Sequence, residues 1–103
     1  MMPKTLGICV STPNSMPHVL GLARAAKKAG IKAEIFLTGE GVHLTQDPCF
    51  PELLQYGRIG VCEVSHIERG FQGIEIPGLV DKDFVTQARN AELVEDCDRY
   101  LVL

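Results

Sequence analysis

One cysteine stands where the sequence predicts an activated thiol. The apolar run at 59–61 predicts a short strand, and residues 63–69 predict a short helix that ends before Gly70. Cys62 lies at the junction, so we expect it at the helix N-terminus, where backbone N–H groups lack intrahelical partners. The positive end of a helix favours the thiolate, which is nucleophilic and can carry sulfur. The alternative is that Cys62 is a small buried side chain at a strand end.

Two further side chains on the predicted helix bear on this chemistry. His66 follows Cys62 by four residues, so the two can share one helix face. An imidazolium there would lower the pKa of the thiol, whereas the alternative is a histidine on the helix surface. Arg69 either attracts an anion to the site or stabilises the C-terminal end of the helix.

The other cysteines have simpler interpretations. Cys9 lies inside an apolar run and is expected to pack in the core, and Cys97 is expected to be structural. Cys49 lies in a proline-flanked loop, where it is either merely exposed or a resolving thiol for Cys62. The sequence contains no C-x-x-C pair, which argues against a zinc ribbon or a thioredoxin motif. One further set of metal-binding side chains matches no standard zinc spacing, so no metal or other cofactor is expected: His43, Cys49, Cys62 and His66.

The elements that must position Cys62 alternate between strands and helices. Strands are predicted at 5–10, 31–38, 59–61, 83–86 and 99–103, and helices at 15–30, 50–56, 63–69 and 88–96. This alternation predicts an α/β fold of three layers, with a five-stranded parallel sheet covered on both faces. The length of 103 residues indicates a single domain, 1–103. The flavodoxin-like strand order 2-1-3-4-5 fits this length best.

That strand order predicts where a site would form. It makes the first and third strands neighbours, and ligands in such sheets bind beyond the carboxyl ends of the strands, at the switch point. The loops at 11–15 and 39–43 would then converge on Cys62. The residues expected to bind substrate there, together with Arg69, are Ser11, Asn14, Gly39, Gly41 and His43. The segment 39–41 (Gly-Glu-Gly) is not a phosphate-binding loop, because it lacks the third glycine and the Lys-Ser/Thr pair.

Composition excludes several classes of protein. The net charge is −3 and there is no basic cluster with interleaved aromatic residues, which argues against direct nucleic-acid binding. No run of about 18 apolar residues is present, so no membrane span is expected. Residues 1–5 lack the pattern of a signal peptide, and we expect a cytoplasmic protein with reduced thiols. The mean hydropathy of +0.10 is high for a small chain and suggests apolar surface covered by further subunits.

The chain resembles the DsrE/DsrF-like family of small sulfur-relay proteins, which includes the TusD-type subunits of the thiouridine sulfur relay. Four segments carry the resemblance: the strand and polar loop at 6–15, Ala29-Gly30 followed by 33–42, Val61-Cys62 followed by Arg69-Gly70, and 97–103. Together they span nearly the whole chain, although 71–83 matches poorly. The resemblance implies assembly into homotrimers or homohexamers. It also implies a cysteine, matched here by Cys62, that receives sulfur as a persulfide from one protein and passes it to another.

Two classes of function follow. The first is a sulfur carrier with sulfurtransferase-like chemistry on Cys62, which exchanges sulfur with protein donors and acceptors and needs no organic cofactor. The second is a non-catalytic oligomeric binding or assembly module of the same fold, in which Cys62 is inert.

Overall fold

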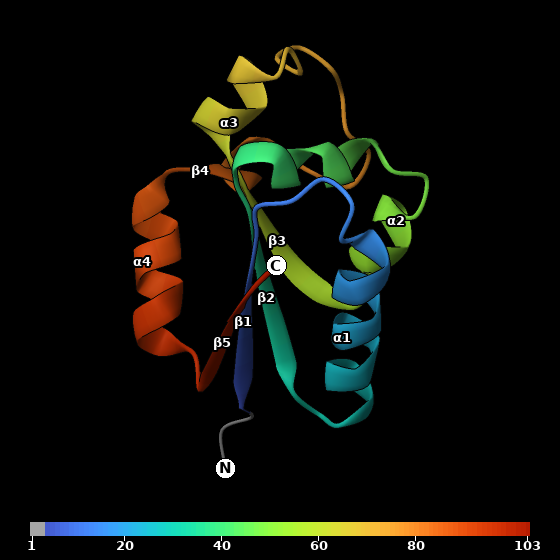
Figure 1. Ribbon diagram of the computed structural model, residues 1–103, viewed down its shortest axis with the longest axis vertical. Coiled ribbons are helices and arrows are strands. Elements are labelled where there is room, and N and C mark those ends of the chain that lie inside the picture. The colour runs from blue at the N-terminus through green and yellow to red at the C-terminus, as the bar shows by residue number, and fades with distance from the viewer. Residues whose placement is uncertain (1–3) are drawn as a thin grey trace.

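The computed structural model describes residues 4–103, with helices and strands alternating along the chain (Figure 1). The elements are β1 (Thr5–Val10), α1 (Met16–Lys28), β2 (Lys32–Leu37), the 3-10 segment η1 (Gly39–Gln46), α2 (Phe50–Leu53), β3 (Gly57–Cys62), α3 (Glu63–Glu68), the 3-10 segment η2 (Asp81–Asp83), β4 (Phe84–Val85), α4 (Gln87–Asp96) and β5 (Arg99–Val102). Residues 1–3, which belong to the segment 1–5 expected to be no signal peptide, lie outside the described range. No helix among residues 4–103 combines the length and apolar character needed to cross a membrane.

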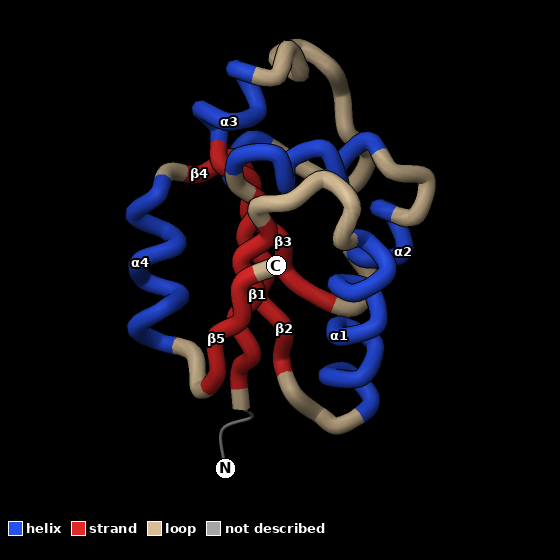
Figure 2. Tube along the Cα trace, in the orientation of Figure 1, coloured by secondary structure: helices blue, strands red, loops and turns tan. Residues whose placement is uncertain are grey.

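The predicted fold class is confirmed. All four strand pairings in the five-stranded sheet are parallel. Helices α1 and α2 lie on one side of the sheet and α4 lies on the other, while α3 extends beyond the carboxyl end of β3 (Figures 1 and 2). The molecule is therefore the three-layer, doubly wound α/β structure expected from alternating elements.

The order of strands across the sheet is β4-β3-β2-β1-β5. The sheet extends in both directions from β1, as in a flavodoxin-like fold. The expected order 2-1-3-4-5 makes β1 and β3 neighbours, whereas here β2 lies between them. The first three crossovers all step in one direction, from β1 to β4, and the last returns to the other side of β1. Right-handed crossovers then place α4 on the opposite face from α1 and α2. The switch point is consequently between β1 and β5.

The two faces of the sheet bury different cores. The larger core lies beneath α1, whose apolar side chains recur at helical spacing: Met16, Val19, Leu20, Ala23 and Ala26. These pack on side chains such as Ile8, Ile35 and Val61, which are at most 4% exposed. The smaller core lies beneath α4 and contains Cys9, Phe36, Cys62 and Leu93. Cys62 therefore belongs to the layer between the sheet and α4.

Several local predictions need correction. Residues 39–43, expected as a loop, belong to the 3-10 segment η1, which extends to Gln46. The second helix is only four residues long and ends at Leu53. The fourth strand is reduced to Phe84–Val85, because the preceding segment turns at Gly73 and Gly78, both with positive φ, and contributes only its last residues to the sheet.

Candidate functional site

Cys62 lies at the junction that the sequence predicts. It is the last residue of β3 and the N-cap residue of α3, and it is 3% exposed. The parallel register pairs Leu37 of β2 with Val61 of β3, which brings Thr38, the residue after β2, next to Cys62. The site is thus built at the carboxyl ends of two adjacent strands, β2 and β3, rather than between β1 and β3.

Three residues supply hydrogen-bond donors to the sulfur of Cys62. The Nε2 amide of Gln87, at the start of α4, lies 3.6 Å from Sγ. The hydroxyl groups of Thr38 and Ser65 also lie close enough to lower the pKa of Cys62, although of the three only Gln87 meets the geometric criterion for a hydrogen bond to the sulfur. The backbone N–H of Ser65 faces it as well, although its geometry falls short of a full capping hydrogen bond. The sulfur therefore sits in a pocket of donors drawn from β2, α3 and α4.

The donors are themselves oriented by neighbouring groups. Ser65 Oγ accepts a hydrogen bond from the Gly39 backbone N–H at 2.9 Å, so its own proton is free to point at Cys62. Thr38 Oγ1 accepts from Gln87 Nε2 at 2.9 Å and likewise keeps its proton for the sulfur. Each hydroxyl accepts one hydrogen bond and retains its proton, which can be donated to the sulfur.

The balance of these contacts favours the thiolate. Burial is the largest single influence on Cys62 and raises its pKa, because a charge is poorly solvated there. The donors of Ser65, Thr38 and Gln87 stabilise the charged form, and together they bring the pKa of Cys62 below its ordinary value. Hydrogen bonds thus add to any effect of the short helix α3, whose six residues give only a small dipole.

His66 does not lie among these donors. Its side chain is 5% exposed and packs against two aromatic rings, with centroids 4.8 Å from Phe84 and 5.7 Å from Phe71. Burial lowers the pKa of His66, and the Phe71 carbonyl and the Glu63 carboxylate offset this only in part. A buried histidine of lowered pKa is neutral near pH 7, so the imidazolium expected beside Cys62 is not supported. The physical reason is that the ring turns into the apolar layer instead of along the helix toward Cys62.

Of the predicted binding residues, Gly39 contacts the Cys62 site most directly, through its hydrogen bond to Ser65. Ser11 lies instead at the switch point between β1 and β5, where its backbone N–H donates to the Leu103 carbonyl at 2.6 Å. Asn14 is exposed in the loop that precedes α1. Ser11 and Asn14 follow β1, and the interposed β2 keeps this strand end away from that of β3.

Gly41, His43 and Arg69 belong to the contact between η1 and α3. A Cβ on Gly41 would overlap with the Val10 carbonyl oxygen, so only glycine allows η1 to approach β1 this closely. The Glu40 carboxylate lies 2.8 Å from Arg69 and 3.2 Å from His43. Arg69 therefore joins α3 to η1 by an ion pair at the end of the helix remote from Cys62.

Sequence reasoning missed Thr38, Ser65 and Gln87. Ser65 carried a usable signal, since a serine three residues after an N-cap position can face the capping side chain. Thr38 follows only from the pairing of β2 with β3. Gln87 carries no local signal, because its contact depends on how α4 docks against the sheet.

None of the remaining thiols is among the hydrogen-bond partners of Cys62, although Cys9 lies in the same small core. All four cysteines are free; Cys9 is buried and Cys49 is exposed. Within the described part of the chain, no three His, Cys, Asp or Glu side chains gather in a way that could hold a metal ion. Cys62 with its surrounding donors is therefore the candidate site for thiol chemistry.

Fold and site together define a doubly wound α/β protein with a hydrogen-bonded cysteine at the carboxyl edge of its parallel sheet. A comparison of the sequence with models of known protein families finds no match. A comparison with curated proteins finds none either.

Proposed function

We propose that this protein is a small sulfur carrier that holds a persulfide on Cys62. The observation that carries the proposal is the position of Cys62 at the carboxyl end of β3, where Gln87 donates to its sulfur and the neighbouring hydroxyls of Ser65 and Thr38 help to lower its pKa. Such donors favour a thiolate, which is the form that accepts and releases sulfur. The resemblance of the sequence to DsrE/DsrF-like proteins supports the same function.

The proposed transfer needs no oxidant or cofactor. The Cys62 thiolate attacks the outer sulfur of a donor persulfide, R–S–S–H; a new S–S bond forms and R–S⁻ leaves, which gives Cys62–S–S–H. An acceptor thiolate then attacks that outer sulfur, and Cys62–S⁻ leaves. The donors that stabilise the thiolate act in both steps, because Cys62 is the attacking group in the first and the leaving group in the second.

Access to the sulfur is controlled by Gln87. Cys62 is 3% exposed, whereas Gln87 is an exposed residue whose side chain bridges Thr38 and the sulfur. In the proposed cycle Gln87 turns outward to admit a partner and returns when the partner leaves.

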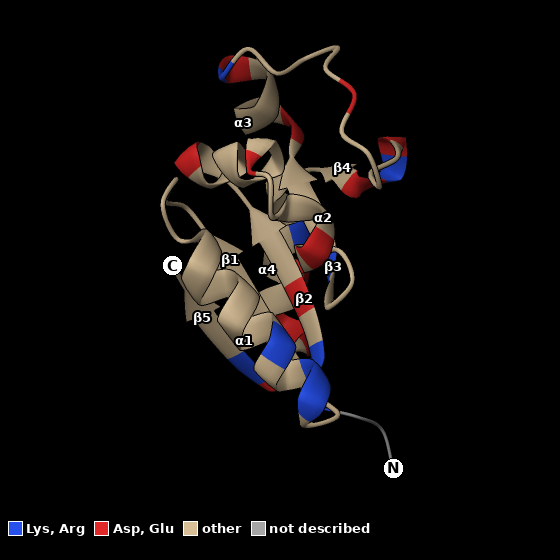
Figure 3. Ribbon diagram, turned by 90° about the vertical axis from the view of Figure 1, so that its right-hand side faces the viewer, with Lys and Arg blue, Asp and Glu red and all other residues tan. Residues whose placement is uncertain are grey.

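We propose that the protein exchanges sulfur with a protein donor and a protein acceptor in the cytoplasm. We also propose that it does so as a homotrimer or homohexamer. Two groups of exposed apolar side chains are available for contact between subunits: Val64, Ile67, Ile74 and Val80 around α3, and Leu101 and Val102 on the edge strand β5. The net charge of −3 argues against direct nucleic-acid binding; along the ribbon of Figure 3, acidic residues occur in β2, η1 and α2, and basic residues occur at the end of α1.

The test is to load sulfur on the purified protein. The protein is incubated with a low-molecular-weight persulfide, desalted and treated with cyanide, which releases bound sulfane sulfur as thiocyanate. We expect close to one equivalent of thiocyanate per chain from the wild type and from Cys49→Ser, and almost none from Cys62→Ser. Cys49→Ser is the matched control because Cys49 is the exposed thiol. Equal release from wild type and Cys62→Ser would overturn the proposal.

The second candidate, a binding module with an inert Cys62, is favoured by the low exposure of that side chain. It predicts that folded Cys49→Ser takes up no sulfur, while the same chain in denaturant reacts at its three remaining cysteines. Loading in the presence and absence of denaturant therefore separates the two candidates.

A further inference from the structure

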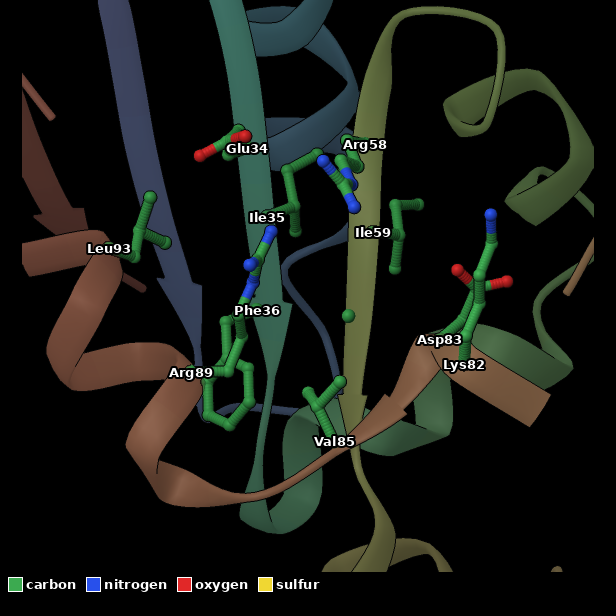
Figure 4. A pocket seen from close by; sticks show the side chains of 11 residues that line it. Glu34, Ile35, Phe36, Arg58, Ile59, Lys82, Asp83, Val85, Arg89 and Leu93 are labelled. Carbon is green, nitrogen blue, oxygen red and sulfur yellow. The ribbon is translucent and has the colours of Figure 1, made fainter. Parts of the chain in front are cut away.

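A small cavity lies on the α4 side of the sheet, over β2 and β3. Its volume is about 90 Å³, and its floor includes Phe36 and Gly60, which are paired in the register of the two strands. Helix α4 contributes Arg89 and Leu93 to its wall (Figure 4). The space exists because α4 packs mainly over β1, which leaves part of β2 and β3 without a covering helix.

Two arginine side chains reach this cavity from different elements. Figure 4 shows Arg89 extending from α4 across β2, toward the side on which Arg58 projects from β3. Among residues 4–103, neither guanidinium has a carboxylate oxygen within 4.0 Å. The other arginines are engaged within the chain: Arg24 with Glu52, Arg69 with Glu40 and Glu68, and Arg99 with the Asp98 carbonyl oxygen.

We propose that this cavity binds a small tetrahedral oxyanion between Arg58 and Arg89. Guanidinium groups present paired N–H donors whose spacing matches the oxygens of phosphate-like anions. The volume is well below the roughly 300–1,000 Å³ of pockets for drug-sized ligands, so it suits an inorganic ion or one terminal group of a larger molecule. Lys82 lines the same cavity and adds positive charge at its rim.

Two carboxylates, those of Asp83 and Glu34, also line the cavity and oppose its positive charge to different extents. Asp83 lines the cavity, but its Oδ2 accepts a hydrogen bond from the Val80 backbone N–H at 2.7 Å, so it is held by the adjoining turn. Glu34 is the cross-strand neighbour of Arg58, and its carboxylate lies 3.9 Å from the Lys32 ammonium. Glu34 is thus the group that opposes an incoming anion most directly, and its loss should strengthen binding.

Two-dimensional NMR with inorganic phosphate as the probe tests this site at constant ionic strength. We expect a saturable shift of the Gly60 amide signal, which reports the cavity floor. Arg58→Gln and Arg89→Gln should each weaken phosphate binding at least tenfold, whereas Glu34→Gln should tighten it several-fold. Lys28→Gln is the matched control: it removes the same charge from the end of α1, away from the cavity, and should leave the affinity unchanged. Thermal unfolding of each variant verifies that it is folded.

The same titration with other anions identifies the source of the oxyanion. Sulfate or thiosulfate binding as well as phosphate would assign the site to free inorganic ions. Tighter binding of adenosine monophosphate, still dependent on both arginines, would assign it to the phosphate group of an organic ligand. Shifts that grow linearly, that chloride reproduces, or that survive both arginine substitutions would overturn the proposal.

Discussion

Replacement of Ser65 by alanine should raise the pKa of Cys62 while leaving the fold intact. Ser65 is 8% exposed, its hydroxyl accepts from the Gly39 N–H, and its proximity to the sulfur lowers the pKa of Cys62. Alanine removes this hydroxyl but keeps the backbone N–H. A hydrogen bond to a charged group contributes about 1.5–3 kcal/mol, and one pKa unit corresponds to about 1.4 kcal/mol. The neutral thiol also loses a weaker interaction with the Ser65 hydroxyl, and this loss offsets part of the effect on the thiolate. We therefore expect the pKa of Cys62 to rise by about one unit rather than two.

The pH dependence of Cys62 alkylation measures this change. The rate follows the thiolate fraction, and mass analysis of the peptide that contains Cys62 separates it from the other thiols. Ser15→Ala is the matched control, since Ser15 is 7% exposed and its hydroxyl bonds to the Thr12 carbonyl, remote from Cys62. The control should leave the curve unchanged. Superimposable curves for wild type and Ser65→Ala, in folded protein, would refute the assignment of Ser65 as a donor to the sulfur.

Four further outcomes are expected. Cys62 should be alkylated before the buried Cys9, and the reverse order would contradict the activated thiol. The folded pKa of His66 is lowered, so urea titrations should show stability that is constant above about pH 6.5 and falls below it, less steeply in His66→Gln. Gly41→Ala should destabilise by at least about 1–3 kcal/mol in the same assay, because its methyl group overlaps with the Val10 carbonyl. Light scattering should give a trimeric or hexameric mass; 11.3 kDa would indicate a monomer.

The strands and most helices were predictable because their signals are local. A continuous apolar run marks β1, the apolar residues 35–37 mark β2, and helical spacing of apolar residues ending near Gly30 marks α1. The order of strands was not predictable in the same way, because right-handed crossovers can build a sheet in either direction from β1. Which side each strand takes depends on long-range packing, here on the docking of α4 and β5.

The site was predictable only where it follows from local structure. Cys62 was identified from the junction of one strand and one helix. Thr38 was missed because the order 2-1-3-4-5 separates the second and third strands, whereas the structure pairs them. The spacing of His66 from Cys62 places both on one helix but does not decide which way the ring turns. Phe71 and Phe84 decide this, and both come from outside α3.

The groups that surround the sulfur of Cys62 come from distant parts of the chain, so they are synthesised at different times. Thr38, Cys62 and Ser65 leave the ribosome before Gln87, and the last donor arrives only when α4 docks on the sheet. Until then Cys62 is closer to an ordinary thiol and is not covered by Gln87. The reactivity of this one sulfur is therefore expected to report whether α4 has docked on the sheet.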